Sequence, residues 1–137
     1  MTESKNDGAL TLRLHVWFER NEKIFMGIGR ALLLEKIEEY GSLRQAATEM
    51  KMSYRAAWGK LKAAEESIGK PLVQKIKGKG QRYELTPVGR QLARQFQQLQ
   101  SDIETYAMSK AQDIFGDDVR YHADASPESK LSSLKVD

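Results

Sequence analysis

Hydrophobic and polar residues alternate strictly over residues 10–18, near the start of the chain. The apolar positions are Leu10, Leu12, Leu14, Val16 and Phe18, and Thr11, Arg13, His15 and Trp17 fall between them. A period of two is typical of a half-buried strand in an antiparallel sheet. Residues 19–23 are polar and predict a turn, after which residues 23–26 predict a short partner strand.

The apolar spacing then becomes that of helices. Residues 31–40 carry leucine, isoleucine and tyrosine at helical intervals, and Gly41 predicts the end of this first helix. Ser42 and Gln45 form the Ser-x-x-Gln pattern that opens many helices. We therefore expect a short second helix with the sequence LRQAATEM, followed by a tight connection.

A third helix is expected over residues 54–68, with Ser53 as its N-cap and Gly69 at its end. Its apolar stripe consists of Ala57, Leu61, Ala64 and Ile68. The side chains left to point elsewhere are Tyr54, Arg55, Trp58 and Lys62, with Gly59 among them. Two short helices joined by a few residues, the second with a polar and aromatic outer face, indicate a helix-turn-helix at about residues 42–68.

Residues 72–86 have the pattern of a hairpin. Two strand-like runs, LVQKI and QRYEL, flank a basic tip with the sequence KGKG. A hairpin directly after the third helix predicts a winged helix-turn-helix domain over residues 10–86, with residues 1–9 as a flexible N-terminus. The fold class is thus mainly α with small β elements, including a strand or hairpin at the N-terminus.

A long fourth helix is predicted over residues 87–115, because Thr86 is an N-cap residue and Pro87 favours the first helical turn. Apolar or small residues recur in heptad steps at Leu85, Gly89, Leu92, Phe96, Leu99, Ile103 and Tyr106. We expect the helix to dimerise through Leu92, Phe96, Leu99, Ile103 and Tyr106. The alternative is packing of this stripe against the N-terminal helix or strands of the same chain. Residues 116–137 are polar and acidic and predict a flexible tail.

Charge is distributed unevenly along the 137 residues. The formal net charge is +3, yet residues 41–95 hold twelve basic and four acidic residues, while the segments on either side are acidic. A basic middle segment is typical of a protein that binds a polyanion such as nucleic acid. The simpler interpretation is a solvated lysine-rich surface.

Composition argues against several other classes of protein. The chain has no cysteine, and its two histidines, His15 and His122, lie far apart without further ligands, so we expect no disulfide, metal site or cofactor. Paired-carboxylate and glycine-loop motifs are missing, and the adjacent glutamates at 38–39 and 65–66 are expected to be solvated. An enzyme is therefore not expected. No apolar run approaches the roughly 20 residues of a membrane span, and the N-terminus lacks the pattern of a secretory signal, which favours a cytoplasmic protein.

Residues 41 to about 92 resemble the winged domains of bacterial LysR-type and ModE-type regulators. The matching fragments are GSLRQAA, SYRAAWGKL, GKPLV and YELTPVGRQL, in the expected order and spacing. Ser53, Tyr54, Ala57 and Trp58 are similar to the ModE-type branch, and the similarity extends over residues from about 10 to 115. The resemblance implies binding to double-stranded DNA and dimerisation through the added helix. It does not imply molybdate sensing, because no oxyanion motif of the Ser-Ala-Arg-Asn type is present; any effector or partner protein is undefined.

On this basis we expect a transcriptional regulator whose third helix lies in the major groove and whose basic wing, residues 75–82, lies on the phosphate backbone. The expected DNA-binding residues are Arg44, Ser53, Tyr54, Arg55, Trp58, Lys60, Lys62, Lys77, Lys79 and Arg82. Arg55 is the candidate for a bidentate contact with guanine, and Tyr54 for a phosphate or a thymine methyl group. Arg44, Arg82 and the lysines are expected to contact phosphates.

Two alternatives remain at this point. Trp58 is expected to be partly buried and structural, with incidental contact to the DNA backbone, although it could instead pack on sugars at the groove wall. The main alternative for the whole chain is a winged-helix module that binds another protein and has no specific affinity for DNA.

Overall fold

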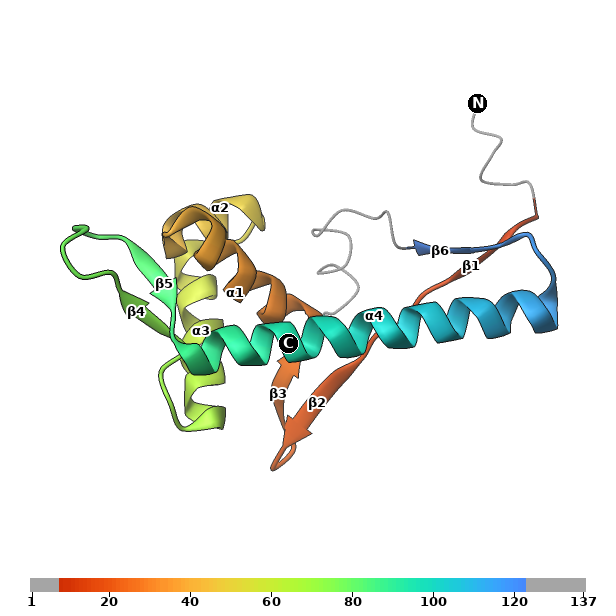
Figure 1. Cartoon of the computed structure of the whole chain (residues 1–137), viewed down its shortest axis with the longest axis horizontal. Helices are drawn as coiled ribbons and strands as arrows, with labels where there is room; N and C mark the ends of the chain where they lie inside the picture. The colour runs from red at the N-terminus through yellow and green to blue at the C-terminus, as the bar shows by residue number, and fades with distance from the viewer. Residues whose placement is uncertain (1–7, 123–137) are drawn as a thin grey trace.

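The computed structural model describes residues 8–122. Its elements are a set of three helices, three small two-stranded sheets and one long helix that extends far beyond the other helices (Figure 1). Most of the segment expected to be a flexible N-terminus, and residues 123–137 of the expected tail, lie outside the described residues.

Helices α1 (Ile28–Tyr40), α2 (Leu43–Glu49) and α3 (Tyr54–Ile68) form the centre of the fold. The local signals for their ends are confirmed. Gly41 ends α1 in the left-handed conformation, with φ of 66°. The Ser42 hydroxyl accepts a hydrogen bond from the Gln45 amide (3.0 Å), and the Ser53 hydroxyl accepts one from the Ala56 amide (3.0 Å).

The hydrophobic core lies between these three helices and the elements that follow them. Its members include Leu33, Leu34 and Ile37 of α1, Ala46 and Ala47 of α2, and Ala57, Leu61 and Ala64 of α3. Alanines at the crossing of α2 and α3 let the two helix backbones approach closely. This close approach fixes how far the outer face of α3 projects from the molecule.

The N-terminal alternation gives two separate strands instead of the single predicted one. Strand β2 (Trp17–Arg20) pairs antiparallel with β3 (Lys23–Gly27), as expected, around a turn at Asn21 and Glu22 with φ of 54° and 66°. Positive φ at both central residues is the mark of a tight hairpin turn. Strand β1 (Leu10–Leu12) has a different partner and a different direction, so the prediction of one antiparallel strand over residues 10–18 was wrong.

The partner of β1 is β6 (Val119–Tyr121), and the two strands run parallel. The predicted flexible tail from residue 116 therefore does not hold for residues 119–121. Burial raises the pKa of the Tyr121 hydroxyl, and its hydrogen bond with the Glu104 carboxylate raises it further. The hydrogen bond between Tyr121 and Glu104 joins β6 to the long helix.

The wing consists of β4 (Val73–Lys75) and β5 (Tyr83–Leu85), which pair antiparallel. Gly78 and Gly80, at the tip between the two strands, have φ of 77° and 66°, which glycine adopts readily. The wing projects from the α1–α3 core at the end opposite to the far end of the long helix (Figure 1).

The long helix α4 spans Pro87–Phe115, and the Thr86 hydroxyl caps it by accepting a hydrogen bond from the Gly89 amide (3.1 Å). Its first half packs on α1, and its second half extends beyond the core, where β1 and β6 lie along it (Figure 1). A Cβ atom at Gly89 would collide with the Leu72 carbonyl. Glycine is needed there because the start of α4 touches the backbone just before the wing.

Candidate nucleic-acid interface

The outer face of α3 carries four of the residues expected to bind DNA. Tyr54 is 41% exposed and Trp58 is 46% exposed, and Arg55 and Lys62 are also exposed. Three residues on the opposite face, Ala57, Leu61 and Ala64, are buried, as the stripe predicted. The fourth predicted member, Ile68, is half-buried at the end of the helix. The fold thus holds α3 rigidly and leaves its aromatic and basic side chains free of the core.

Two of these aromatic side chains each carry a cation. The Arg44 guanidinium of α2 lies over the Tyr54 ring, 4.4 Å from its centroid. The Lys62 ammonium lies over the Trp58 ring at 5.0 Å and also pairs with Glu65 at 3.2 Å. Such contacts are worth about 0.5–1 kcal/mol at exposed positions. They place positive charge over both aromatic rings of the α3 face.

Trp58 corrects one expectation. It was expected to be partly buried and structural, but its side chain is 46% exposed and lies beneath the Lys62 ammonium, one helical turn further along α3. The small residues Ala57 and Ala64 fill the helix contact, so no large side chain is needed there.

Lys60 lies apart from the outer face. It is half-buried and next to Leu61 in sequence. At 3.6 residues per turn it projects about 140° away from Arg55. The structure therefore does not bring Lys60 together with Arg55 and Lys62, although all three are in the same helix.

The wing provides the remaining expected cations. Lys77 and Lys79 are exposed at its tip, and Lys75 is exposed at the end of β4. Arg82 is also exposed, but one guanidinium nitrogen donates a hydrogen bond to the Tyr40 carbonyl (3.4 Å) at the end of α1. A Cβ atom at Gly41 would collide with this guanidinium. Arg82 thus holds the wing against α1 in addition to carrying charge.

Two glutamates fix the wing in place, which the sequence did not indicate. Glu38 of α1 accepts a hydrogen bond from the Leu85 amide (2.8 Å) and pairs with Arg90 of α4 (3.3 Å). Glu65 of α3 accepts one from the Leu72 amide (2.8 Å). Both were expected to be merely solvated, and that expectation was wrong. Their partners lie 47 and 7 residues away in sequence, and no local pattern marks either carboxylate.

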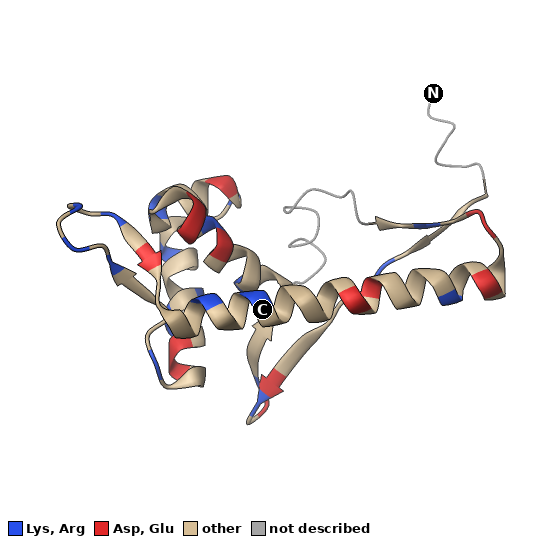
Figure 2. Ribbon diagram, viewed as in Figure 1, with Lys and Arg blue, Asp and Glu red and all other residues tan. Residues whose placement is uncertain are grey.

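Lys and Arg positions are prominent in the wing, in α3 and at the start of α4, whereas Asp and Glu positions are prominent in α1, at the end of α3 and in the second half of α4 (Figure 2). The α3 face and the wing tip both carry exposed basic residues, namely Arg55, Lys62, Lys77 and Lys79.

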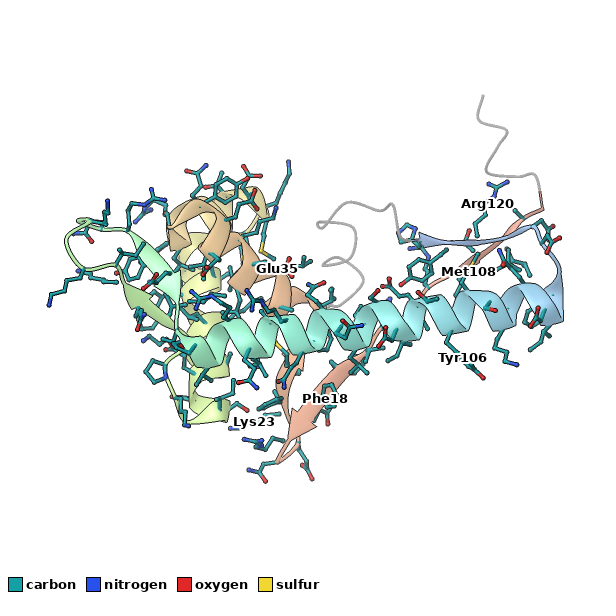
Figure 3. All side chains as sticks on the ribbon, in the orientation of Figure 1. Phe18, Lys23, Glu35, Tyr106, Met108 and Arg120 are labelled. Carbon is teal, nitrogen blue, oxygen red and sulfur yellow. The ribbon has the colours of Figure 1, made fainter. Side chains whose placement is uncertain are left out.

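The residues expected to dimerise divide into two groups. Phe96 is 4% exposed because it packs within its own chain, where its ring meets Phe18 edge-on at 6.3 Å. Leu92, Leu99 and Ile103 are half-buried, and Tyr106 is 66% exposed. Phe18 and Tyr106 project on the same side of α4, opposite to Met108 and β6 (Figure 3). The first part of the stripe thus serves the fold of the chain itself, which was the alternative to dimerisation.

An apolar groove of about 230 Å³ opens on this side of α4. Its walls are the β2–β3 hairpin and the first half of α4, and it is lined by Phe18, Phe25, Met26, Leu92, Gln95, Phe96 and Leu99. Within residues 8–122, no helix is long and apolar enough to span a membrane, and no three histidine or acidic side chains gather in a way that could hold a metal ion.

Comparison with known proteins agrees with this architecture. The sequence profile described as "Bacterial regulatory helix-turn-helix protein, lysR family" matches residues 30–90. Transcriptional regulator ModE of Haemophilus influenzae is 35% identical over 57 residues, which is 42% of this chain and 22% of that protein. Molybdenum transport protein ModE of Azotobacter vinelandii is 32% identical over 78 residues, or 56% of this chain and 29% of that protein. The matches thus span less than a third of either relative.

Two solved structures have the same fold. One is the CbnR_DBD–DNA complex, with a TM-score of 0.52 and 20% identity over 63% of this chain and 99% of that chain. The other is the BenM_DBD/benA site 1 DNA complex, with a TM-score of 0.54 and 17% identity over 67% of this chain and all of that one. Together, the α1–α3 arrangement and the wing show a winged helix-turn-helix fold, and residues 30–90 of this fold are similar to the helix-turn-helix domain that the lysR-family profile describes.

Proposed function

We propose that this chain is a sequence-specific regulator that binds double-stranded DNA as a homodimer. Helix α3 enters the major groove, and the wing, residues 75–82, lies along the phosphate backbone. The observation that carries the proposal is the exposed α3 face with its aromatic and basic side chains, beside a wing tip with two exposed lysines.

Arg55 is the residue assigned to base recognition. It lies in the first turn of α3, where helix-turn-helix proteins contact base edges, and its side chain is exposed. A guanidinium can donate two parallel hydrogen bonds to guanine, which no other base pair accepts in the same geometry. Tyr54 and Ser53, at the same end of the helix, are assigned to contacts with the adjacent phosphate or a thymine methyl group.

Phosphate contacts are assigned to Arg44, Lys62, Lys77, Lys79 and Arg82. These contacts need charge and reach more than exact geometry, so exposed lysines at a glycine-containing tip suit them. Arg44 and Lys62 are already held over aromatic rings, which restricts their side chains before DNA arrives. Lys60 is a weaker candidate because it lies on the flank of α3.

The related proteins support this assignment. The structures of CbnR_DBD and BenM_DBD that share the fold are complexes with DNA, and one of the ModE relatives is named a transcriptional regulator. Because the matching profile describes a family of regulatory proteins, we expect no enzymatic activity.

Dimerisation is assigned to the side of α4 that carries Leu99, Ile103 and Tyr106. The groove beside Phe18 lies at one end of this surface and the exposed Tyr106 ring at the other. Two copies of α4 running antiparallel place each tyrosine near the groove of its partner.

Charge favours the same arrangement. The first half of α4, residues 87–101, has two arginines and no acidic residue, and the second half, residues 102–115, has three acidic residues and one lysine. Antiparallel helices bring opposite charges together, whereas parallel helices would bring like charges together. The dimer would present its two α3 helices to successive major grooves, roughly 34 Å apart.

The second candidate function is a protein-binding module, which the exposed Tyr54 and Trp58 rings could serve. Both rings already lie under cations of the same chain, and an interface with protein has less need of lysines at the wing tip. This arrangement favours DNA over a protein partner.

The proposal can be tested with the whole chain and fluorescent duplexes. We expect binding to random duplex at low salt, with log K falling by about 0.9 for each phosphate neutralised as log salt rises. Selection from a random duplex library should then enrich a site with two related half-sites. A lack of binding at low salt would refute the function, and a flat salt response would refute the phosphate contacts.

A further inference from the structure

Gly59 is at the middle of α3 and on its exposed face. A Cβ atom added there would meet no other atom within 4 Å, apart from the neighbouring backbone of its own helix. Glycine is one of the least favourable residues in a helix interior. Nothing in the described part of the fold, residues 8–122, therefore requires glycine at this position, and alanine would make α3 more stable.

Two residues assigned to DNA flank this position. Arg55 precedes Gly59 by four residues and Lys62 follows it by three, so both lie next to it on the helix surface. Lys62 also lies over the ring of Trp58, which points about 100° away from Gly59 around the helix. We refer to the surface over Gly59, between Arg55 and Lys62, as the Gly59 notch.

We infer that the Gly59 notch receives a sugar–phosphate strand at the edge of the major groove. The inference rests on the proposed DNA binding and adds a positioning residue to it. Arg55 lies in the first turn of α3, facing the base edges. Gly59 lies four residues further along, about 6 Å up the helix, where the bordering strand passes. Without a Cβ atom, the helix backbone approaches this strand closely, while Arg55 and Lys62 provide positive charge on either side.

The test is the variant Gly59→Ala in the whole chain. We expect the midpoint of thermal unfolding to rise by roughly 3–5 °C, because alanine is the better helix former. DNA affinity should fall by roughly tenfold, since one methyl group in a tight contact forces the two surfaces apart. A protein that is more stable and yet binds less tightly is the result that supports the inference.

Ser67→Ala is the matched control. Ser67 is near the end of α3 on a different flank, and alanine there also favours the helix. The hydrogen bond that its backbone carbonyl accepts from Arg20 (2.8 Å) is retained. This variant should keep wild-type DNA affinity. The control thus separates the effect of a more stable helix on affinity from the effect of a methyl group in the Gly59 notch. If Ser67→Ala weakens binding as much as Gly59→Ala does, the notch has no role.

Comparing the loss of affinity for the selected site with the loss for random duplex identifies which part of the DNA occupies the notch. A loss that is equal for the selected site and for random duplex supports the sugar–phosphate strand. A loss confined to the selected site would place a base at the notch and overturn the assignment. If wild type and Gly59→Ala bind equally well, the inference fails and the proposed function stands, whereas a wild-type chain that binds no duplex overturns both.

Discussion

The Arg44 guanidinium lies over the Tyr54 ring, with its Cζ atom 4.4 Å from the ring centroid. This contact joins the first turn of α2 to the first turn of α3, the two helix ends that meet DNA in the proposed complex. Arginine side chains lose considerable freedom when they bind a phosphate. A ring beneath the guanidinium removes part of that freedom in advance.

The first prediction concerns this pair. Arg44→Ala and Tyr54→Ala should each weaken DNA binding, and the double variant should be less affected than the sum of the two, with a coupling of about 0.5–1 kcal/mol. Tyr54→Phe keeps the ring and should retain this coupling. Fluorescence anisotropy with the selected duplex measures all four variants. Additive losses would mean that the two side chains act independently.

The second prediction separates base recognition from phosphate binding. Arg55→Ala should reduce discrimination between selected and random duplex by about 1–3 kcal/mol. Lys79→Ala should weaken both equally and reduce the slope of log K against log salt by about 0.9. Lys23→Ala removes the same charge from the β2–β3 hairpin, away from the wing (Figure 3). It should change neither the affinity for the two duplexes nor the slope of log K against log salt. Equal effects of Arg55→Ala and Lys79→Ala on both duplexes would contradict the assignment of Arg55 to bases and of Lys79 to phosphates.

The third prediction concerns the dimer. Tyr106→Glu should weaken self-association by roughly tenfold or more, because it places a charge where an apolar groove is expected. Thr105→Glu is the control, since Thr105 is exposed and its side chain points about 100° away around the helix. Sedimentation equilibrium measures both. If the two variants weakened self-association equally, the effect would come from added charge anywhere on α4 and not from the face that carries Tyr106.

The fourth prediction concerns the anchoring of the wing. Glu38→Ala should lower the free energy of unfolding by about 1–2 kcal/mol, because the half-buried Leu85 amide loses its acceptor. Glu39→Ala, its neighbour in sequence, removes only an exposed pair with Lys36 and should cost about 0.5 kcal/mol or less. Urea unfolding compares the two variants. A similar cost for both would show that Glu38 does not hold the wing.

The ends of the helices could be predicted because the forces that set them are local. The hydroxyls of Ser53 and Thr86 accept hydrogen bonds from backbone amides three residues further along the chain. Gly41 and Gly69 adopt the left-handed conformation that ends a helix. The buried stripe of α3 follows from its own period. These signals lie within one or two turns of the chain, so the sequence alone displays them.

The features that sequence reasoning missed depend on contacts across the fold. Glu38 and Glu65 resemble solvated residues until the wing brings amides to them. Trp58 was expected to be partly buried and structural, but the buried alanines Ala57 and Ala64 fill the helix contact and its side chain is exposed. The break in the alternation of residues 10–18 follows from the arrangement of partner strands, since Leu10–Leu12 has β6 beside it and Trp17–Arg20 has β3.

The parallel pairing of β1 with β6 joins Leu10 to Val119, across nearly the whole described chain. This sheet can close only after α4 and β6 have been synthesised, so among the elements of residues 8–122 it is the last to form during translation. Its closure connects the chain that leaves α4 to the segment leading into the β2–β3 hairpin, and β3 packs on α3. Strand β6 is therefore linked to the helix assigned to DNA through β1, the β2–β3 hairpin and the packing of β3 on α3.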